Sequence, residues 1–213
     1  MINNYKALNG LDRKMEKYIN YRDGYFIEIG GNDGINQSNT YFYEKSLGWN
    51  GILIEPSEKF EKLRLNRDVP GNHLYNDACC SFSDKGKNIE FIYSNLMTIA
   101  ENIKGDIDDI DKFIESSRQH MGGQDNYKFI KKGRPLSDIL DESSAPTDID
   151  FFSLDTEGME GEVLKGIDFS TYSFKFILVE CRDIDKLTNV LSTHNYSCID
   201  KISHHDYVFS KNT

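Results

Sequence analysis

The chain has 213 residues and a formal net charge of −10, with 38% hydrophobic and 28% charged residues. This length fits a single domain spanning residues 1–213, which would bury roughly 70% of the surface that its unfolded chain exposes. Because an acidic surface repels phosphate backbones, we expect no nucleic-acid partner.

Neither a membrane segment nor a signal segment is predicted from the hydropathy pattern. No window approaches the roughly 20 apolar residues that a bilayer requires, and the first residues, MINNYK, are not a basic and then apolar signal segment. We therefore expect no membrane span and a cytoplasmic location. The four cysteines form no CxxC pair and are expected to be reduced core residues, with a redox pair at Cys79 and Cys80 as the alternative.

Helical and extended patterns alternate along the first third of the chain. A helix is expected within residues 1–20, where leucine, methionine and isoleucine recur at near-helical spacing. Strand and helix patterns then follow in turn at residues 25–29, 38–47, 51–54, 57–67 and 73–77. Such alternation is typical of a parallel sheet with helices on both faces.

The regular alternation is then interrupted, because the gap before the next buried strand is too long for a simple crossover. We treat residues 80–148 as an insertion that forms a lid or substrate platform, with a linker or disordered excursion as the alternative. Within it, the patterns indicate a strand at 89–93, helices at 106–117 and 136–141, and a polar loop at 118–127. Beyond it, strands at 149–154, 176–179, 196–200 and 207–209 are expected, with helices at 159–165 and 183–191.

The segment FIEIGGNDG at residues 26–34 ends an apolar strand in a turn with three glycines. A nicotinamide site would need glycines where Asn32 and Ile35 stand. Glu28 and Asp33 would also repel its pyrophosphate. Glycines let a backbone approach a ligand closely, so the turn suits a cationic cofactor without phosphate. S-adenosylmethionine has that chemistry, with a sulfonium, an ammonium group, a ribose diol and an adenine.

Each predicted parallel strand ends in a carboxylate, and ligands of open parallel sheets bind at these strand ends. Glu55 is suited to accept hydrogen bonds from both ribose hydroxyls. Asp77 is suited to accept from the adenine amino group, while Glu28 would anchor the turn or attract the ammonium group. The predicted cofactor-binding set is Glu28, Gly30, Gly31, Asn32, Gly34, Glu55, Pro56, Asp77, Ala78 and Asp155. The alternative for each is an ordinary tight turn or a solvated strand end.

Two of these segments resemble the FkbM family of S-adenosylmethionine-dependent methyltransferases. EIGGNDG at 28–34 is similar to the family's Asp-x-Gly-Ala-Asn-x-Gly, with Glu28 in place of Asp. SLDTEGME at 153–160, followed by VLKG, is similar to its Lys-Ile-Asp-x-Glu-Gly-x-Glu block, with Ser153 in place of Lys. A weaker likeness covers RPLSDIL at 134–140.

The resemblance implies an α/β, Rossmann-like class I methyltransferase fold. Its sheet would be seven-stranded and mainly parallel, with an antiparallel last strand and helices on both faces. The resemblance also implies O-methylation of a sugar hydroxyl in a glycan, polysaccharide or glycosylated metabolite. Other readings stay open, namely N-methylation, protein or peptide methylation, and a non-catalytic cofactor-binding module.

A hydroxyl acceptor must lose a proton as it takes the methyl group. Asp155 and Glu157, in one loop, are the first candidates for the base and for acceptor orientation. The alternatives are that Asp155 holds the cofactor's amino group and that Glu157 caps the next helix. His205, beside His204 in the predicted hairpin turn, is the second choice because a histidine base suits neutral pH. His120 would meet substrate only if its loop folded over the site.

Two further clusters of charged residues each have more than one possible role. Asp155, Glu157 and Glu180 offer the hard oxygen ligands that magnesium or calcium prefers, so a divalent cation is an alternative second cofactor. A basic cluster either meets an anionic acceptor or forms a solvated face. Its members are Lys128, Lys131, Lys132 and Arg134. The sequence predicts a small-molecule or carbohydrate acceptor as partner and predicts no oligomeric state.

Overall fold

The computed structural model describes residues 4–103, 105–107, 109–117 and 125–212. At its centre lies a seven-stranded sheet in the order β10-β11-β9-β8-β1-β2-β3. The strands are β1 (Tyr25–Ile29), β2 (Asn50–Ile54), β3 (His73–Tyr75), β8 (Asp148–Leu154), β9 (Ser173–Glu180), β10 (Tyr196–Lys201) and β11 (Asp206–Lys211). The last strand, β11, runs antiparallel to both neighbours, while β1, β2, β3, β8 and β9 pair in parallel. The predicted sheet is confirmed.

Helices cover both faces of this sheet, because successive side chains of each strand point to opposite sides. Phe26, Leu53 and Phe151 pack with residues of one helix set. That set is α1 (Leu11–Met15), α2 (Tyr41–Leu47) and α3 (Phe60–Arg67). Ile27 and Phe152, on the opposite face, pack with residues of a second helix set. That set is α5 (Leu136–Glu142), α6 (Glu160–Leu164) and α7 (Ile184–Ser192).

The predicted N-terminal helix is much shorter than expected. Among residues 4–20, only a short 3-10 turn, η1 (Leu8–Gly10), and the five-residue α1 are helical. Asn9 and Gly10 have φ of 53° and 65°, which is the left-handed conformation that interrupts a helix. The Asp12 carboxylate also accepts hydrogen bonds from the backbone N–H groups of Lys6 and Ala7, at 2.7 and 3.1 Å. Local hydrogen bonding therefore replaces the first helical turns.

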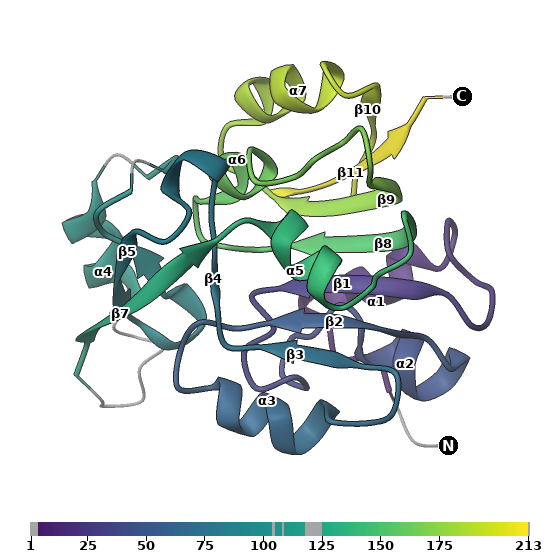
Figure 1. Cartoon of the computed structure of the whole chain (residues 1–213), viewed down its shortest axis with the longest axis horizontal. Coiled ribbons are helices and arrows are strands. Elements are labelled where there is room, and N and C mark those ends of the chain that lie inside the picture. The colour runs from purple at the N-terminus through teal and green to yellow at the C-terminus, as the bar shows by residue number, and fades with distance from the viewer. Residues whose placement is uncertain (1–3, 104, 108, 118–124, 213) are drawn as a thin grey trace.

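The insertion, together with the two residues before it, folds into a second sheet of four strands, in the order β4-β7-β5-β6. The strands are β4 (Ala78–Cys79), β5 (Asn88–Tyr93), β6 (Ile99–Ala100) and β7 (Tyr127–Arg134). Two 3-10 turns, η2 (Phe82–Asp84) and η3 (Asn95–Met97), and α4 (Ile110–Ser117) accompany it. Figure 1 shows this sheet beyond the carboxyl ends of the central strands, at the left of the view.

β7 was not anticipated, because no element was predicted for residues 128–134. Most of the polar loop predicted at 118–127 lies outside the described residues. The described part of the insertion is an ordered sheet whose small core includes Ile89 and Phe91. The alternative of a disordered excursion is therefore wrong for these residues. Phe91 stacks on Phe129 of β7, with ring centroids 5.0 Å apart.

Two sequence expectations on burial also have clear outcomes. All four cysteines are free, and Cys79, Cys80 and Cys181 are buried as predicted. Cys198 is exposed instead, because it lies on the edge strand β10. Within the described residues, every helix is too short or too polar to span a bilayer.

Candidate active site

A cavity of about 390 Å³ opens at the carboxyl ends of the central strands. Ten of the predicted site residues line it, from five separate segments of the chain. They are Gly30, Gly31, Asn32, Glu55, Pro56, Asp77, Ala78, Asp155, Glu157 and His205. The cavity volume lies within the roughly 300–1,000 Å³ typical of small-molecule sites.

The glycine turn is held between the ends of β2 and β8. The N–H groups of Gly30 and Gly31 donate to the Ile54 carbonyl at 3.0 and 3.1 Å. Gly30 has φ of 84°, and a Cβ there would lie 2.1 Å from the Asp155 carbonyl oxygen. Only glycine fits that position. Glycine is therefore needed at position 30 first of all for packing within the protein. This packing brings the backbone of the turn to the cavity wall.

Glu28 and Gly34 are not among the described residues that line the cavity. The two-residue period of β1 turns Glu28 toward α2 and α3. There its carboxylate accepts hydrogen bonds from Ser38 Oγ, the Asn39 N–H and Thr40 Oγ1 at 2.7–2.9 Å. Glu28 therefore anchors the segment that begins α2, and not the glycine turn for which an anchoring role was predicted.

Arg67, which the sequence did not single out, explains why glycine is needed at position 34. Arg67 is fully buried, and its Nε lies 2.6 Å from Glu44 Oε2 while its Nη1 lies 3.7 Å from Glu28 Oε2. Its Nη1 also donates to the Gly34 carbonyl at 2.9 Å. A Cβ on Gly34 would lie 2.6 Å from Arg67 Cγ. This ion network depends on α2 and α3 packing side by side, and no local sequence pattern signals it.

Glu55 and Asp77 stand on the cavity wall that was assigned to the nucleoside. Glu55 is 7% exposed, and its two oxygens accept from the N–H groups of Asn32 and Ser57 at 2.9 Å each. Burial raises the pKa of Glu55, although these hydrogen bonds oppose the shift. A carboxylate has about four acceptor positions, so Glu55 keeps capacity for ligand hydroxyls. Asp77 already pairs with Arg134 at 3.0 Å.

Acidic side chains gather on the opposite wall. Three carboxylate oxygens, one each from Asp155, Glu157 and Glu180, lie within 4.8 Å of one another. Burial raises the pKa of Asp155 well above its usual value, and Glu180 and Glu157 add to the shift. Burial and the charge of Glu180 raise the pKa of Glu157 to about 8, although Arg182 opposes them. Arg182 Nη2 lies 2.9 Å from Glu157 Oε2.

The loop that carries Glu157 has a constrained backbone. Glu157 has φ of 54° and Gly158 has φ of 102°. A left-handed conformation at a residue other than glycine costs roughly 1–3 kcal/mol and often marks a functional site. Glu160, 2% exposed, holds the loop because its Oε1 accepts from the N–H and hydroxyl of Thr156 and the N–H of Gly158 at 2.9–3.1 Å. Glu160, not Glu157, therefore caps this turn.

The predicted hairpin turn, between β10 and β11, brings His205 to the same wall. Its Nε2 lies 3.6 Å from Glu180 Oε2 and 3.9 Å from Asp206 Oδ2. His204 meets His205 edge-to-face, with ring centroids 3.6 Å apart, and is exposed. His120, the third histidine considered, lies outside the described residues.

The sequence pattern of the Methyltransferase FkbM domain matches residues 28–207. The chain belongs to this family. The family is one of methyltransferases, which in general use S-adenosylmethionine. The matched span contains every predicted cofactor-binding residue and the acidic cluster.

Two solved structures resemble this FkbM methyltransferase domain. A methyltransferase FkbM from Methylobacillus flagellatus aligns with a TM-score of 0.51 and 16% identity, over 88% of this chain and 43% of that one. The chain thus spans less than half the length of that protein. A precorrin-6y C5,15-methyltransferase from Geobacter metallireducens aligns with a TM-score of 0.43 and 12% identity, over 94% and 85% of the two chains. No curated protein matches the sequence.

Two members of the basic cluster of this FkbM domain pair with carboxylates of the chain itself. Lys128 pairs with Glu101 at 2.6 Å, and Arg134 pairs with Asp77 and Glu142. The other two members are Lys131, which donates to the Asn76 side chain, and Lys132. None of the four is among the described residues that line the active-site cavity. The prediction of an anionic acceptor held by this cluster therefore receives no support.

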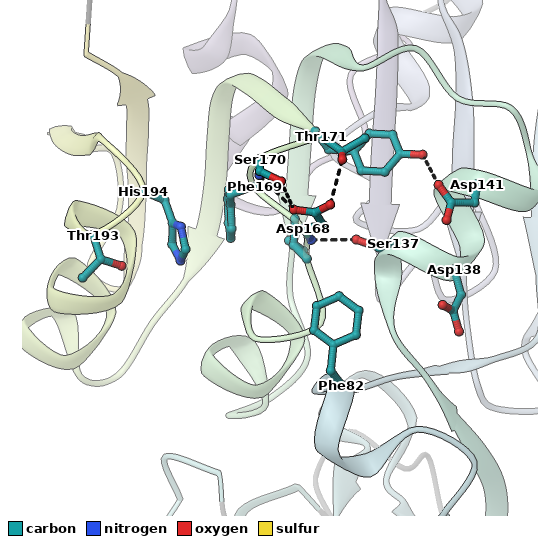
Figure 2. A pocket seen from close by; sticks show the side chains of 12 residues that line it. Phe82, Ser137, Asp138, Asp141, Asp168, Phe169, Ser170, Thr171, Thr193 and His194 are labelled. Carbon is teal, nitrogen blue, oxygen red and sulfur yellow. Dashed lines mark hydrogen bonds between the residues drawn. The ribbon is translucent and has the colours of Figure 1, made fainter.

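A larger cavity of about 830 Å³ lies elsewhere, beside the segment that leads into the amino end of β9 (Figure 2). Its polar groups mainly bond to one another. Asp168 accepts from Thr171 Oγ1 at 2.7 Å, and Tyr172 donates to Asp141 at 2.5 Å. It contains none of the predicted site residues, and ligands of parallel sheets bind at the opposite, carboxyl ends of strands. The smaller cavity is therefore the candidate active site.

Proposed function

We propose that the chain is an S-adenosylmethionine-dependent methyltransferase that acts on a hydroxyl group of a sugar or a glycosylated small molecule. One observation carries the proposal. A single cavity joins the glycine turn and Glu55, suited to a nucleoside, to a wall of carboxylates whose pKa values are raised. A cytoplasmic location is part of this proposal and fits a chain whose cysteines are all free.

The cofactor would lie along the turn at Gly30–Asn32. Glu55 would accept from the ribose hydroxyls, and the Ala78 N–H and the Asp77 carboxylate would meet the adenine. Asp155 follows directly on β8 and its backbone contacts Gly30. It would therefore receive the ammonium group, one of the two roles considered for it.

When bound, the cofactor supplies an electrophilic methyl group on sulfur, and transfer is an in-line displacement. Glu157 would remove the proton from the acceptor hydroxyl. A base is most effective when its pKa lies near the working pH, and the pKa of Glu157 at about 8 meets that condition. Arg182 stabilises the carboxylate form, and Glu160 fixes the loop backbone. His205, next to Glu180, is the second candidate for the base.

The second sheet would supply the acceptor platform. Phe91 and the turn η3 at Asn95–Met97 line the cavity together with the acidic wall. The acceptor would therefore lie between this sheet and Glu157. This arrangement supports the assignment of the insertion as a substrate platform.

A divalent cation is a second candidate for the acidic wall. The closeness of Asp155, Glu157 and Glu180 favours it, because three carboxylates suit magnesium or calcium. A cation there would lower the pKa of the acceptor hydroxyl and reduce the need for Glu157 as the base.

The test begins with calorimetry of S-adenosylmethionine and S-adenosylhomocysteine binding to the purified protein. Labelled methyl donor is then offered with monosaccharides, alkyl glycosides, sugar nucleotides and peptides, and products are read by mass. Glu157→Gln should keep cofactor binding and lose roughly 10²–10⁴-fold in turnover. The control variant Glu162→Gln on α6 should retain both cofactor binding and turnover. A folded protein that binds neither form of the cofactor contradicts the proposal. Binding without turnover of any acceptor favours the non-catalytic module, and methylated peptides favour the protein-acceptor alternative.

A further inference from the structure

A third cavity, of about 230 Å³, adjoins the candidate active site. It shares two lining residues with that site, Glu157 and Met159. Its apolar lining residues are Ile99, Ala100, Ile103, Ile107, Ile110 and Met159. We call it the isoleucine pocket.

The polar side chains on the wall of the isoleucine pocket are engaged elsewhere. Glu101 pairs with Lys128 at 2.6 Å. Asn102 accepts from the Glu90 N–H at 2.9 Å and donates to the Asn88 carbonyl at 3.0 Å. The half-buried isoleucines of the wall retain uncovered apolar surface. The pocket therefore offers a ligand hydrocarbon contact and few free polar partners among the described residues.

The pocket is held in place relative to the proposed base. The Asp106 N–H donates to the Gly158 carbonyl at 2.8 Å. A Cβ on Gly105 would lie 2.3 Å from that carbonyl oxygen, so the two backbones are in direct contact. The Arg182 guanidinium, which pairs with Glu157, also lies 5.1 Å from the Phe113 ring of α4. The segment lining the pocket thus packs directly on the loop that carries Glu157.

We propose that the acceptor is amphipathic, with the reacting hydroxyl at Glu157 and a hydrocarbon group of the same molecule in the isoleucine pocket. This inference rests on the proposed function and narrows its substrate class. A wholly hydrophilic sugar would leave the isoleucines against water, whereas an alkyl or other apolar aglycone would cover them. Each buried methylene is expected to tighten binding about fourfold.

The test uses n-alkyl β-D-glucosides with chains of one, four, six and eight carbons, added below their micelle concentrations to protein saturated with S-adenosylhomocysteine. Isoleucine δ1-methyl groups are labelled with ¹³C and followed by NMR. Affinity should rise by up to about fourfold per methylene until the pocket is filled. The largest shifts should fall on the isoleucines of the pocket.

Matched variants locate the effect. Ile103→Asn and Ile110→Asn should abolish the gain with chain length, while Ile130→Asn, at a 57% exposed position of β7 outside both cavities, should keep it. Circular dichroism establishes that each variant folds. Equal affinity for all chain lengths, or no glucoside binding, overturns the inference. If S-adenosylhomocysteine binding is normal in that case, the proposed function still stands. Loss of cofactor binding in the unaltered protein overturns both.

Discussion

Glu157 is expected to titrate near pH 8 in the free protein, far above the ordinary glutamate value of 4.5. Burial disfavours its charged form, and the nearby Glu180 carboxylate repels it. Glu180→Gln removes that negative charge and should lower the pKa of Glu157. Arg182→Gln removes the positive charge beside Glu157 Oε2 and should raise the pKa of Glu157 further. The two variants therefore act in opposite directions on one group.

The size of the Glu180 effect follows from Coulomb's law. Oxygens no more than 4.8 Å apart repel by at least about 0.9 kcal/mol in water and about 3.5 kcal/mol at an effective dielectric constant of 20. One pKa unit corresponds to 1.36 kcal/mol. Glu180→Gln should therefore lower the midpoint of Glu157 by roughly 0.6 to 2.5 pH units.

The assay is a pH titration of ¹³C-labelled glutamate carboxyls by NMR, which needs no acceptor. Glu157→Gln identifies the resonance by its loss. A midpoint near 4.5 in the unaltered protein, or one that Glu180→Gln leaves unchanged, would refute the reasoning. Because the folded pKa is raised, the stability contributed by Glu157 is fully present below about pH 4.5 and is lost as the pH rises through about 8. Glu157→Gln should remove that dependence from urea unfolding curves.

Four other predictions concern the same architecture. Millimolar magnesium should lower the Glu157 midpoint if a cation binds there, and an unchanged midpoint would exclude the cation. Glu55→Gln should weaken S-adenosylhomocysteine binding at least tenfold, because a hydrogen bond to a charged group contributes about 1.5–3 kcal/mol; calorimetry showing equal affinity would remove Glu55 from the cofactor site. Gly30→Ala should cost about 1–3 kcal/mol in unfolding free energy from its φ alone, and a melting temperature equal to that of the unaltered protein would contradict this. Arg67→Leu should cost about 3–5 kcal/mol by leaving Glu28 and Glu44 buried without their partner, which urea unfolding measures.

The sequence alone determined the sheet and the edge at which its site lies. Hydrophobic periodicity and turn residues are local properties, so the alternation of strands and helices could be predicted from neighbours in the chain. Parallel strands bring their carboxyl ends to one edge, which predicts that the glycine turn, Glu55 and Asp155 lie close together there. The hairpin that carries His205 was predicted in the same local way, from the short spacing between its two strands.

Only the tertiary structure decided which partner each polar side chain takes. Glu28 meets Ser38 and Thr40, and Arg134 takes Asp77, because elements distant in sequence pack together there. The isoleucine pocket likewise exists only where the second sheet meets the Glu157 loop. Contacts of this kind depend on the crossing of whole elements, and residue spacing within one element carries no information about them.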